Sequence, residues 1–387
     1  MVGEQLRVGI NLLFLLPEME GTARNALSLL DELARLDSPI EYVVFVNRDT
    51  PRDRLPSAPN FSVVPLPISA RSRWRRYLYE QVALPIVALR HRVSVMHSMN
   101  YVAPMLLGRR NIVSIHDLNF LQACVEMTPL RRFALRVFVA LAAKTSGKIA
   151  TLSSFSGAEI ERRYNLDPQK TAVVPCAVSD CAGEAGDDDA AVLRALGVRE
   201  RFVLGIGVNK AYKDVHSLLR GYARSDTRQS HQLVLVGRHS GPYDELLELA
   251  QALGVADTTQ FTGAVEDRVL AALYRRASVF VFTSLYEGFG MPPIEAMHYG
   301  APVICSSYGA AREVVGDAAL FVPPKDDVAI AEAIDRLTSD SALRSQLTER
   351  GAARAQTFTW ENSARKLVEL YQATGKIPAP LEIHYER

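Results

Sequence analysis

Two carboxylates and a pair of glycines form the part of the chain best suited to chemistry. Glu287 and Glu295 stand eight residues apart, and Gly288 and Gly290 follow the first of them. Glycines let the backbone approach a ligand closely, so that its N–H groups can bind a diphosphate. Carboxylates accept hydrogen bonds from hydroxyls such as those of a sugar or a ribose. The segment therefore predicts a nucleotide-sugar site.

The elements around this segment predict where the two carboxylates lie. Residues 279–283 are apolar and rich in β-branched and aromatic side chains, as in a buried parallel strand, so Glu287 should follow its carboxyl end. Pro292 and Pro293 suit the first turn of a helix, because N–H groups there lack intrahelical partners. Glu295 would then lie in that first turn, where the dipole favours a carboxylate with or without a ligand.

Other polar residues follow predicted strands and should meet at the same sheet edge. His116 and Asp117 come after the strand 111–115. His116 could hold a sugar hydroxyl, or could simply cap the strand end, and Asp117 suits a helix or turn cap. Gly21 precedes the first helix, where it allows close approach of a ligand or forms an ordinary turn, and Thr22 could cap that helix.

Two lysines follow the predicted strand 202–206. Lys210 and Lys213 could neutralise a diphosphate as it leaves, although a lysine is more often a solvated surface charge. Their position at a carboxyl end favours a functional role, and favours it most for Lys213.

A further loop could recognise the nucleotide base. Gly263 and Val265 lie after another predicted strand and could offer backbone polar groups to the base, or could form a plain strand-to-helix turn. Glu266 and Asp267 could accept hydrogen bonds from guanine N–H groups, or could cap the next helix.

Length and composition limit the classes of protein. The chain has 387 residues, which is long enough for two cores, and its net charge of +1 gives no overall field for nucleic acid. No run approaches the ~20 apolar residues of a membrane span, and no signal-peptide pattern is present. The four cysteines lack metal-ligand spacing, which favours free thiols in a cytoplasmic protein.

Short apolar runs alternate with helical patterns throughout the chain, as in α/β domains. The predicted strands are 8–13, 42–46, 95–97, 112–115, 148–152, 202–206, 232–236, 279–283, 302–304 and 320–322, and the first helix is 22–36. Two doubly wound parallel-sheet domains, Rossmann-like in architecture, are expected to face each other across a cleft. The expected boundaries are 1–182, an acidic linker 183–192, 193–358, a C-terminal helix 359–376 and a tail 377–387.

The chain resembles the retaining glycosyltransferases of family 4, which have the GT-B fold. The matching segments run almost end to end: 7–13, 114–118, 152–156, 173–175, 207–213, 261–265, 287–295 and 358–361. The resemblance implies that the last helix crosses back to the first domain. It also implies transfer of a hexose from a nucleoside-diphosphate sugar, GDP-mannose or a UDP-hexose, to a glycan, lipid-linked or small-molecule hydroxyl. Retention of configuration and independence of metal are expected as well.

The resemblance assigns roles to individual residues. Glu287 and His116 would contact the transferred sugar, and Lys213 the diphosphate. Glu295 would bind the ribose hydroxyls, and the backbone around residues 288–290, which includes Phe289, would bind sugar and phosphates.

Two positions depart from the family pattern. The usual Arg-Lys pair is Tyr212-Lys213 here, which leaves open whether Lys210 takes the place of the arginine. The glycine-rich first loop is reduced to a single glycine, Gly21, and this departure concerns the acceptor or phosphate role that the family pattern gives to that loop. An epimerase or hydrolase on this fold, or a nucleotide-sugar binding protein without activity, are the alternative functions.

A basic and aromatic segment precedes the second predicted helix. It contains Arg71, Arg73, Trp74, Arg75 and Arg76. Such a segment can hold a helix against an anionic membrane, here the inner face of the cytoplasmic membrane, but it can also be a solvated helix face.

Overall fold

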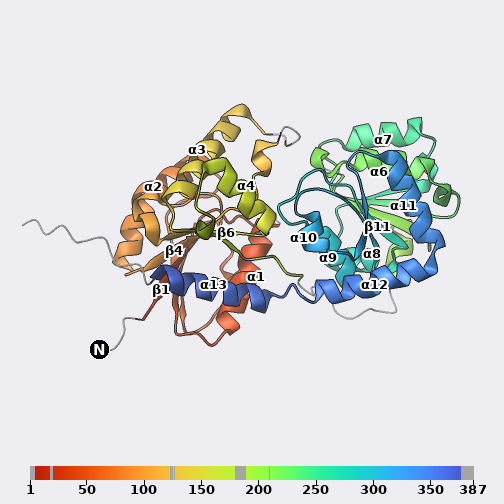
Figure 1. The fold of residues 1–387 in the computed structure, drawn as a ribbon. Coiled ribbons are helices and arrows are strands. Elements are labelled where there is room, and N and C mark those ends of the chain that lie inside the picture. Colours follow the sequence, from red (N-terminus) through yellow and green to blue (C-terminus); the bar gives the residue numbers. More distant parts are fainter. Residues whose placement is uncertain are drawn as a thin grey trace, which may run out of the picture. The chain divides into compact units, whose positions relative to one another are not determined.

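The computed structural model describes residues 5–17, 21–122, 125, 127–178, 189–208 and 210–375. The chain divides into two compact units, each with its own sheet (Figure 1). The first unit contains Met1–Leu118, Thr128–Cys176 and the chain from Trp360 onward, and the second contains Asn119–Met127 and Ala177–Thr359. Residues 183–188 of the predicted linker and the tail 377–387 lie outside the described residues. The last four residues of the predicted linker, 189–192, belong instead to a helix.

The described part of the first unit contains a seven-stranded parallel sheet in the order β3-β2-β1-β4-β5-β6-β7. Its strands are β1 (Arg7–Leu12), β2 (Glu41–Val46), β3 (Phe61–Pro65), β4 (Val95–Ser98), β5 (Asn111–Ser114), β6 (Lys148–Thr151) and β7 (Thr171–Val173). Its longer helices are α1 (Thr22–Arg35), α2 (Arg73–Arg90), α3 (Pro129–Thr145), α4 (Ser154–Tyr164) and α13 (Trp360–Gly375). Five strands agree with the sequence prediction within one residue at each end. The two that were not predicted, β3 and β7, are the partly exposed edge strands.

The described part of the second unit contains a six-stranded parallel sheet in the order β10-β9-β8-β11-β12-β13. Its strands are β8 (Phe202–Ile206), β9 (Gln232–Val236), β10 (Thr259–Gly263), β11 (Val279–Phe282), β12 (Val303–Ser306) and β13 (Ala319–Val322). Its helices are α5 (Asp189–Ala195), α6 (Val215–Arg224), α7 (Tyr243–Ala252), α8 (Asp267–Arg276), α9 (Met291–His298), α10 (Ala311–Val315), α11 (Asp327–Ser339) and α12 (Ser341–Ala355). Both sheets have the doubly wound form that the sequence predicts.

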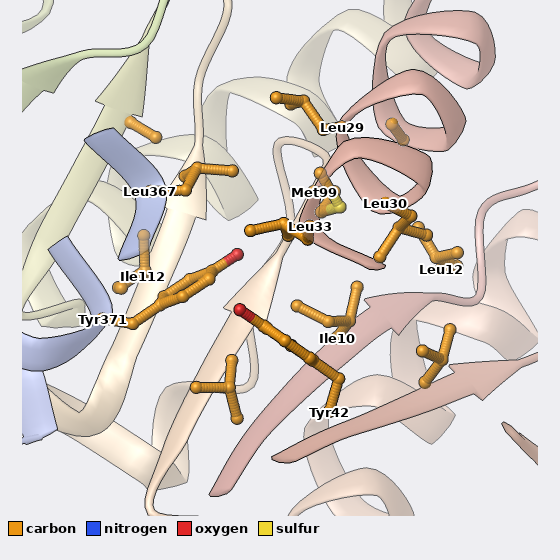
Figure 2. Packing of buried hydrophobic residues seen from close by; sticks show 14 of the residues in the cluster. Ile10, Leu12, Leu29, Leu30, Leu33, Tyr42, Met99, Ile112, Leu367 and Tyr371 are labelled. Atoms are coloured by element: carbon orange, nitrogen blue, oxygen red, sulfur yellow. The ribbon is translucent and has the colours of Figure 1, made fainter. Parts of the chain in front are cut away.

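The C-terminal helix α13 completes the core of the first unit, and it packs against α1 (Figure 1). Leu367 and Tyr371 of α13 lie in one buried cluster with Ile10 and Leu33 (Figure 2). The ring of Tyr371 meets the ring of Tyr42 edge to face, with centroids 6.3 Å apart. The final helix therefore returns to the first unit, as expected.

A buried histidine joins α13 to the sheet. His97 on β4 is bonded through Nδ1 to the Tyr371 hydroxyl at 2.8 Å and through Nε2 to the Ser114 hydroxyl at 2.9 Å. Burial, with a smaller contribution from the nearby His116, lowers the pKa of His97 to about 3. A neutral imidazole with one donor and one acceptor can satisfy both bonds.

Helix α2 corrects one sequence prediction. The side chain of Arg76 is buried, and its Nε lies 3.7 Å from Oε1 of the buried Glu80. Burial raises the pKa of Glu80 to about 7, although the neighbouring Arg76 opposes the change. Arg76 therefore belongs to the interior of the first unit and is not part of an exposed basic segment. No helix in the described residues is long and apolar enough to cross a membrane.

We predict that His97 makes the stability of the protein depend on pH. The unfolded histidine binds a proton below pH ~6.5, whereas the folded one stays neutral until about pH 3. The unfolded state therefore binds more protons, and stability is lost as pH falls from 7 toward 5. His97 alone should contribute a loss of about 2 kcal/mol over that interval.

Urea unfolding of the parent and of His97→Gln at pH 7 and pH 5 tests this contribution. The variant should be less stable than the parent at pH 7, and its free energy of unfolding should fall by a smaller amount between pH 7 and pH 5. On acidification His116 also lowers the stability, whereas Glu80 raises it. Both groups are present in the two proteins, so the difference between parent and variant reports the contribution of His97. Equal losses in the two proteins would contradict the assignment.

Candidate active site

A lysine and a glutamate meet at the carboxyl edge of the second sheet. Lys213 follows β8 and Glu287 follows the adjacent β11, and Lys213 Nζ lies 2.5 Å from Glu287 Oε1. The Ser284 hydroxyl donates a second hydrogen bond to the same oxygen at 3.0 Å. Both charged side chains are largely buried, with 13% of Lys213 and 14% of Glu287 exposed. The predicted lysine and glutamate are therefore brought together, and each is held by the other.

The loop after β8 fixes the position of the lysine. Gly207 has φ +92°, and a Cβ there would lie 2.8 Å from Lys213 Cγ, so the lysine stem packs against bare backbone. Lys213 Nζ lies 4.6 Å from the centroid of the Phe282 ring. The Thr283 hydroxyl donates to the Lys213 carbonyl at 2.9 Å, which ties this loop to the end of β11. The ammonium is thus positioned by backbone and aromatic contacts.

The glycine loop after Glu287 is shaped by a tyrosine. The Tyr308 hydroxyl donates to the Phe289 carbonyl at 3.2 Å. Gly290 has φ +94°, and a Cβ there would overlap that hydroxyl. The Phe289 side chain is buried, with its ring edge to face against Phe358 at 5.3 Å. The ring of Phe289 thus supports the loop from inside, which leaves backbone groups as the part of this residue able to serve a ligand.

Glu295 lies deeper in its helix than predicted. Gly290 is the N-cap of α9, which begins at Met291, so no acidic residue is in the first turn. The predicted first-turn position is wrong because the helix starts one residue before the two prolines. The dipole of the first turn therefore does not account for this carboxylate. Instead, Glu295 Oε2 accepts a hydrogen bond at 3.1 Å from the hydroxyl of the buried Tyr274.

Tyr274 is a hydrogen-bond partner of Glu295 that the sequence did not reveal. Burial and the adjacent Glu295 carboxylate raise its pKa well above the ordinary value, so the hydroxyl stays protonated and remains a donor. Its ring stacks on Tyr299 at a centroid distance of 6.1 Å. Tyr274 lies on α8, and no local spacing connects it with Glu295.

The loop predicted to recognise a base follows β10. Gly263 is the last residue of β10 and not, as predicted, a residue after the strand, and its φ is +74°. Val265 is half-buried, and Glu266 is the N-cap of α8 without a side-chain capping bond. The capping alternative for Glu266 is therefore not realised. Lys210 is exposed and precedes the short 3₁₀ helix η5 (Ala211–Lys213), so it stands at the rim of the Lys213 loop.

The remaining candidates lie in the first unit. His116 follows β5 and is buried, and this burial lowers its pKa to about 4, so it is neutral at physiological pH. The Tyr101 hydroxyl donates to Asp117 Oδ1 at 3.0 Å, and the Tyr101 ring lies 6.0 Å from the His116 ring. Gly21 is the N-cap of α1 with φ +49° and no side-chain capping bond, so the cap predicted from Thr22 is absent.

Within the described residues, no group of three His, Cys, Asp or Glu side chains is arranged to hold a metal ion. The cation shown beside Glu287 is Lys213, and the side chains of Cys176 and Cys305 are both buried. The arrangement suits recognition of an anion and of hydroxyls: a partly buried ammonium, two oriented carboxylates and a glycine loop at the start of a helix.

Comparison with known proteins adds independent findings. A family model described as "Glycosyltransferase Family 4" matches residues 19–180, and one described as "Glycosyl transferases group 1" matches residues 194–354. The chain is 32% identical over 283 residues to O-antigen chain mannosyltransferase B of Escherichia coli, covering 72% of this chain and 74% of that protein. It is 31% identical to the MMP alpha-(1->4)-mannosyltransferase of Mycolicibacterium hassiacum, covering 58% of this chain and 54% of the relative.

Solved structures share the fold at lower identity. Sucrose-phosphate synthase from Thermosynechococcus elongatus superposes with a TM-score of 0.75 at 21% identity, covering 95% of this chain and 98% of that chain. The Anabaena protein HepE in complex with UDP-glucose has a TM-score of 0.73 at 18% identity, covering 95% and 100% of the two chains.

We predict that the glycine loop tolerates no side chain at position 290. Gly290→Ala should lower the free energy of unfolding by about 2 kcal/mol or more, because it combines a positive φ with overlap of the Tyr308 hydroxyl. Adding Tyr308→Phe to Gly290→Ala should recover part of this loss, measured by urea unfolding.

Gly254→Ala is the matched control, because Gly254 has φ +69° and no described atom lies within 4 Å of an added Cβ. Its loss of stability gives the contribution of backbone strain alone, without that of steric overlap between the added Cβ and a neighbouring side chain. Equal losses at positions 254 and 290, with no recovery by Tyr308→Phe, would contradict the role given to Tyr308.

Proposed function

The chain belongs to the group 1 glycosyl transferases of glycosyltransferase family 4, retaining hexosyltransferases with the GT-B fold, and on this premise we propose its substrates and residue roles. The proposed reaction moves a hexose from a nucleoside-diphosphate sugar to an acceptor hydroxyl with retention of configuration. The contact between Lys213 and Glu287 is the observation that carries the assignment of roles.

Lys213 is proposed to bind the diphosphate. A preorganised cation is most effective where negative charge develops, and here that is the departing phosphate. The diphosphate competes with Glu287 for the ammonium, so its binding frees the carboxylate to accept from a sugar hydroxyl. Loop N–H groups at the start of α9 add donors, and this supply of positive charge supports a reaction that needs no metal ion.

The acceptor hydroxyl must lose a proton as it attacks the anomeric carbon. The donor's own phosphate oxygen is the proposed base, since attack and departure occur on the same face of the sugar. The C–O bond to phosphate breaks while the new glycosidic bond forms, and the proton leaves on the released nucleoside diphosphate.

Two further side chains are assigned to the donor. His116 is proposed to hold a hydroxyl of the transferred sugar, and its neutral state lets one ring nitrogen donate and the other accept. Glu295, oriented by Tyr274, is proposed to bind the ribose hydroxyls. Gly21 is proposed to approach the donor through its backbone, because no described atom lies within 4 Å of a Cβ added there.

The donor is proposed to be GDP-mannose, with a UDP-hexose as the second candidate. Two relatives bear the name mannosyltransferase, and Glu266 has no capping bond to compete with guanine N–H groups. A structural neighbour bound to UDP-glucose favours the second candidate. A glycan hydroxyl is the proposed acceptor, with lipid-linked and small-molecule acceptors as alternatives, and the cytoplasm is the proposed location.

We predict that Lys213→Ala and Glu287→Gln each lower kcat/KM by about 10²-fold or more, because each removes an interaction with developing charge or with the sugar. The measurement is nucleoside-diphosphate release with and without acceptor. Lys210 is proposed as a second, weaker contact of the diphosphate, so Lys210→Ala should lower kcat/KM by a smaller factor, because its charge is exposed to solvent and more strongly screened.

Unchanged transfer rates in both site variants would overturn these roles. Nucleotide release at full rate without an acceptor would identify a hydrolase or epimerase instead. Donor binding with no turnover under any condition would identify a binding protein.

The donor base is tested by thermal shift with GDP, UDP, ADP and dTDP and their sugars. A ligand at 100 times its Kd adds about 2.7 kcal/mol to stability, which raises the melting temperature measurably. We predict the largest shift with GDP-mannose, reduced by Glu266→Ala while the UDP shift stays unchanged. A larger shift with a UDP-hexose would select the second candidate.

A further inference from the structure

Large exposed apolar side chains are concentrated on one part of the first unit. Of the twelve in the described residues, ten lie on α2, α3 and the 3₁₀ helix η2 (Met105–Arg110). The ten are Trp74, Leu78, Val82, Ile86, Leu89, Leu106, Leu130, Phe133, Val137 and Leu141. Exposed apolar residues scattered singly need no explanation, whereas a gathering of this kind marks an interaction site.

The spacing of these residues makes a continuous face on each helix. On α2 they recur every three or four residues from Trp74 to Leu89, and on α3 from Leu130 to Leu141, so each set lies along one side of its helix. The two helices lie next to each other (Figure 1), and the Tyr77 ring is 4.9 Å from the Phe138 ring. We call the exposed apolar surface of α2, η2 and α3 the α2–α3 face.

The charged residues of the same three elements are almost all basic. They contain ten Lys or Arg residues and one acidic residue, Glu80, in a chain whose net charge is only +1. Glu80 and one of the bases, Arg76, are buried against each other. The remaining bases are thus not offset by any carboxylate on these elements, which suits a polyanionic partner.

A cavity of about 1090 Å³ opens at the amino-terminal ends of the two helices. It is lined by five arginines, among them Arg73 and Arg131, by apolar groups such as Trp74 and Leu78, and by no Asp or Glu of the described residues. Arg73 and Arg131 are close enough for the charge of Arg73 to lower the pKa of Arg131, in addition to the larger effect of burial. Like charges held at one cavity rim favour the binding of an anionic group there.

We propose that the α2–α3 face docks onto an anionic phospholipid bilayer, with its apolar side chains among the lipid chains and its arginines on the phosphate headgroups. The apolar stripe and the adjoining basic residues match an interfacial helix that lies in the membrane plane. A second copy of the chain is a poor occupant, because a two-fold contact would place this excess of basic residues against itself. This proposal goes beyond the transfer reaction and does not depend on it.

Vesicle flotation of the full chain tests the proposal. The probes are vesicles of phosphatidylcholine alone and of phosphatidylcholine with about one third phosphatidylglycerol, an anionic lipid that attracts surface Lys and Arg. The parent should float with the anionic vesicles, at least about tenfold more than with the neutral ones. Leu78→Asp with Phe133→Asp should lower the bound fraction at least about tenfold, because the apolar contact is lost.

Matched variants separate this face from general effects of charge. Val328→Asp changes an exposed valine on α11 of the second unit and should leave flotation unchanged. Arg73→Glu with Arg131→Glu should also lower binding at least about tenfold. The same change at the exposed Arg194 and at Arg336 should have little effect.

Thermal unfolding should confirm that each variant is folded, since Leu78 and Phe133 are exposed. Absence of flotation by the parent, or equal flotation by the parent and the Leu78/Phe133 variant, would overturn the proposal. A parent dimer that this variant converts to monomer, without vesicle binding, would show that a second copy covers the face. Nucleotide release with a water-soluble acceptor is a separate assay, so failure here would leave the proposed reaction untouched.

Discussion

The ion pair between Lys213 and Glu287 is the interaction around which the second unit is arranged. Two charges that are mostly withdrawn from water cost several kcal/mol unless each has a partner, so neither residue could occupy its position alone. The pair forms because β8 and β11 are hydrogen-bonded neighbours whose carboxyl ends point the same way. Gly207 then provides the space for the lysine stem, and Ser284 satisfies a further acceptor position of the carboxylate.

Glu287 and Glu295 belong to one sequence motif, but different side chains hold them in place. Glu287 is held by a cation, so under the proposed roles its environment changes when a diphosphate binds Lys213. Glu295 accepts a hydrogen bond from the hydroxyl of Tyr274, which is neutral and so offers a diphosphate no positive charge. The first carboxylate is thus coupled to phosphate binding and the second is fixed by the protein. This difference fits a role at the reacting sugar for Glu287 and a static role at the ribose for Glu295.

Sequence pattern predicted the sheet interiors well because a strand covered on both faces is a continuous apolar run. The edge strands β3 and β7 are partly exposed and lack this signal. Local spacing also placed Lys213 and Glu287 at strand ends, but it could not supply Tyr274 or Tyr308, which reach the site from other elements. The burial of Arg76 did have a signal, because Glu80 and Leu84 follow at intervals of four residues and share its helix face.

The overall composition did not indicate the α2–α3 face, for a related reason. A net charge of +1 is an average over the whole chain, and it hides the excess of bases on α2, η2 and α3. A membrane-facing surface needs the charge and the apolar area on the same side of the molecule, and only the fold brings residues 74–89 beside residues 130–141. In the sequence, the basic and aromatic residues 71–76 mark only one end of a single helix. In the fold, α2 and α3 pack together, and their joint surface is large enough to lie on a bilayer. The burial of Arg76 is consistent with this surface, because Arg76 and Glu80 are buried together. The surface loses one positive charge and the one negative charge of these elements, so the exposed charges that remain on them are basic.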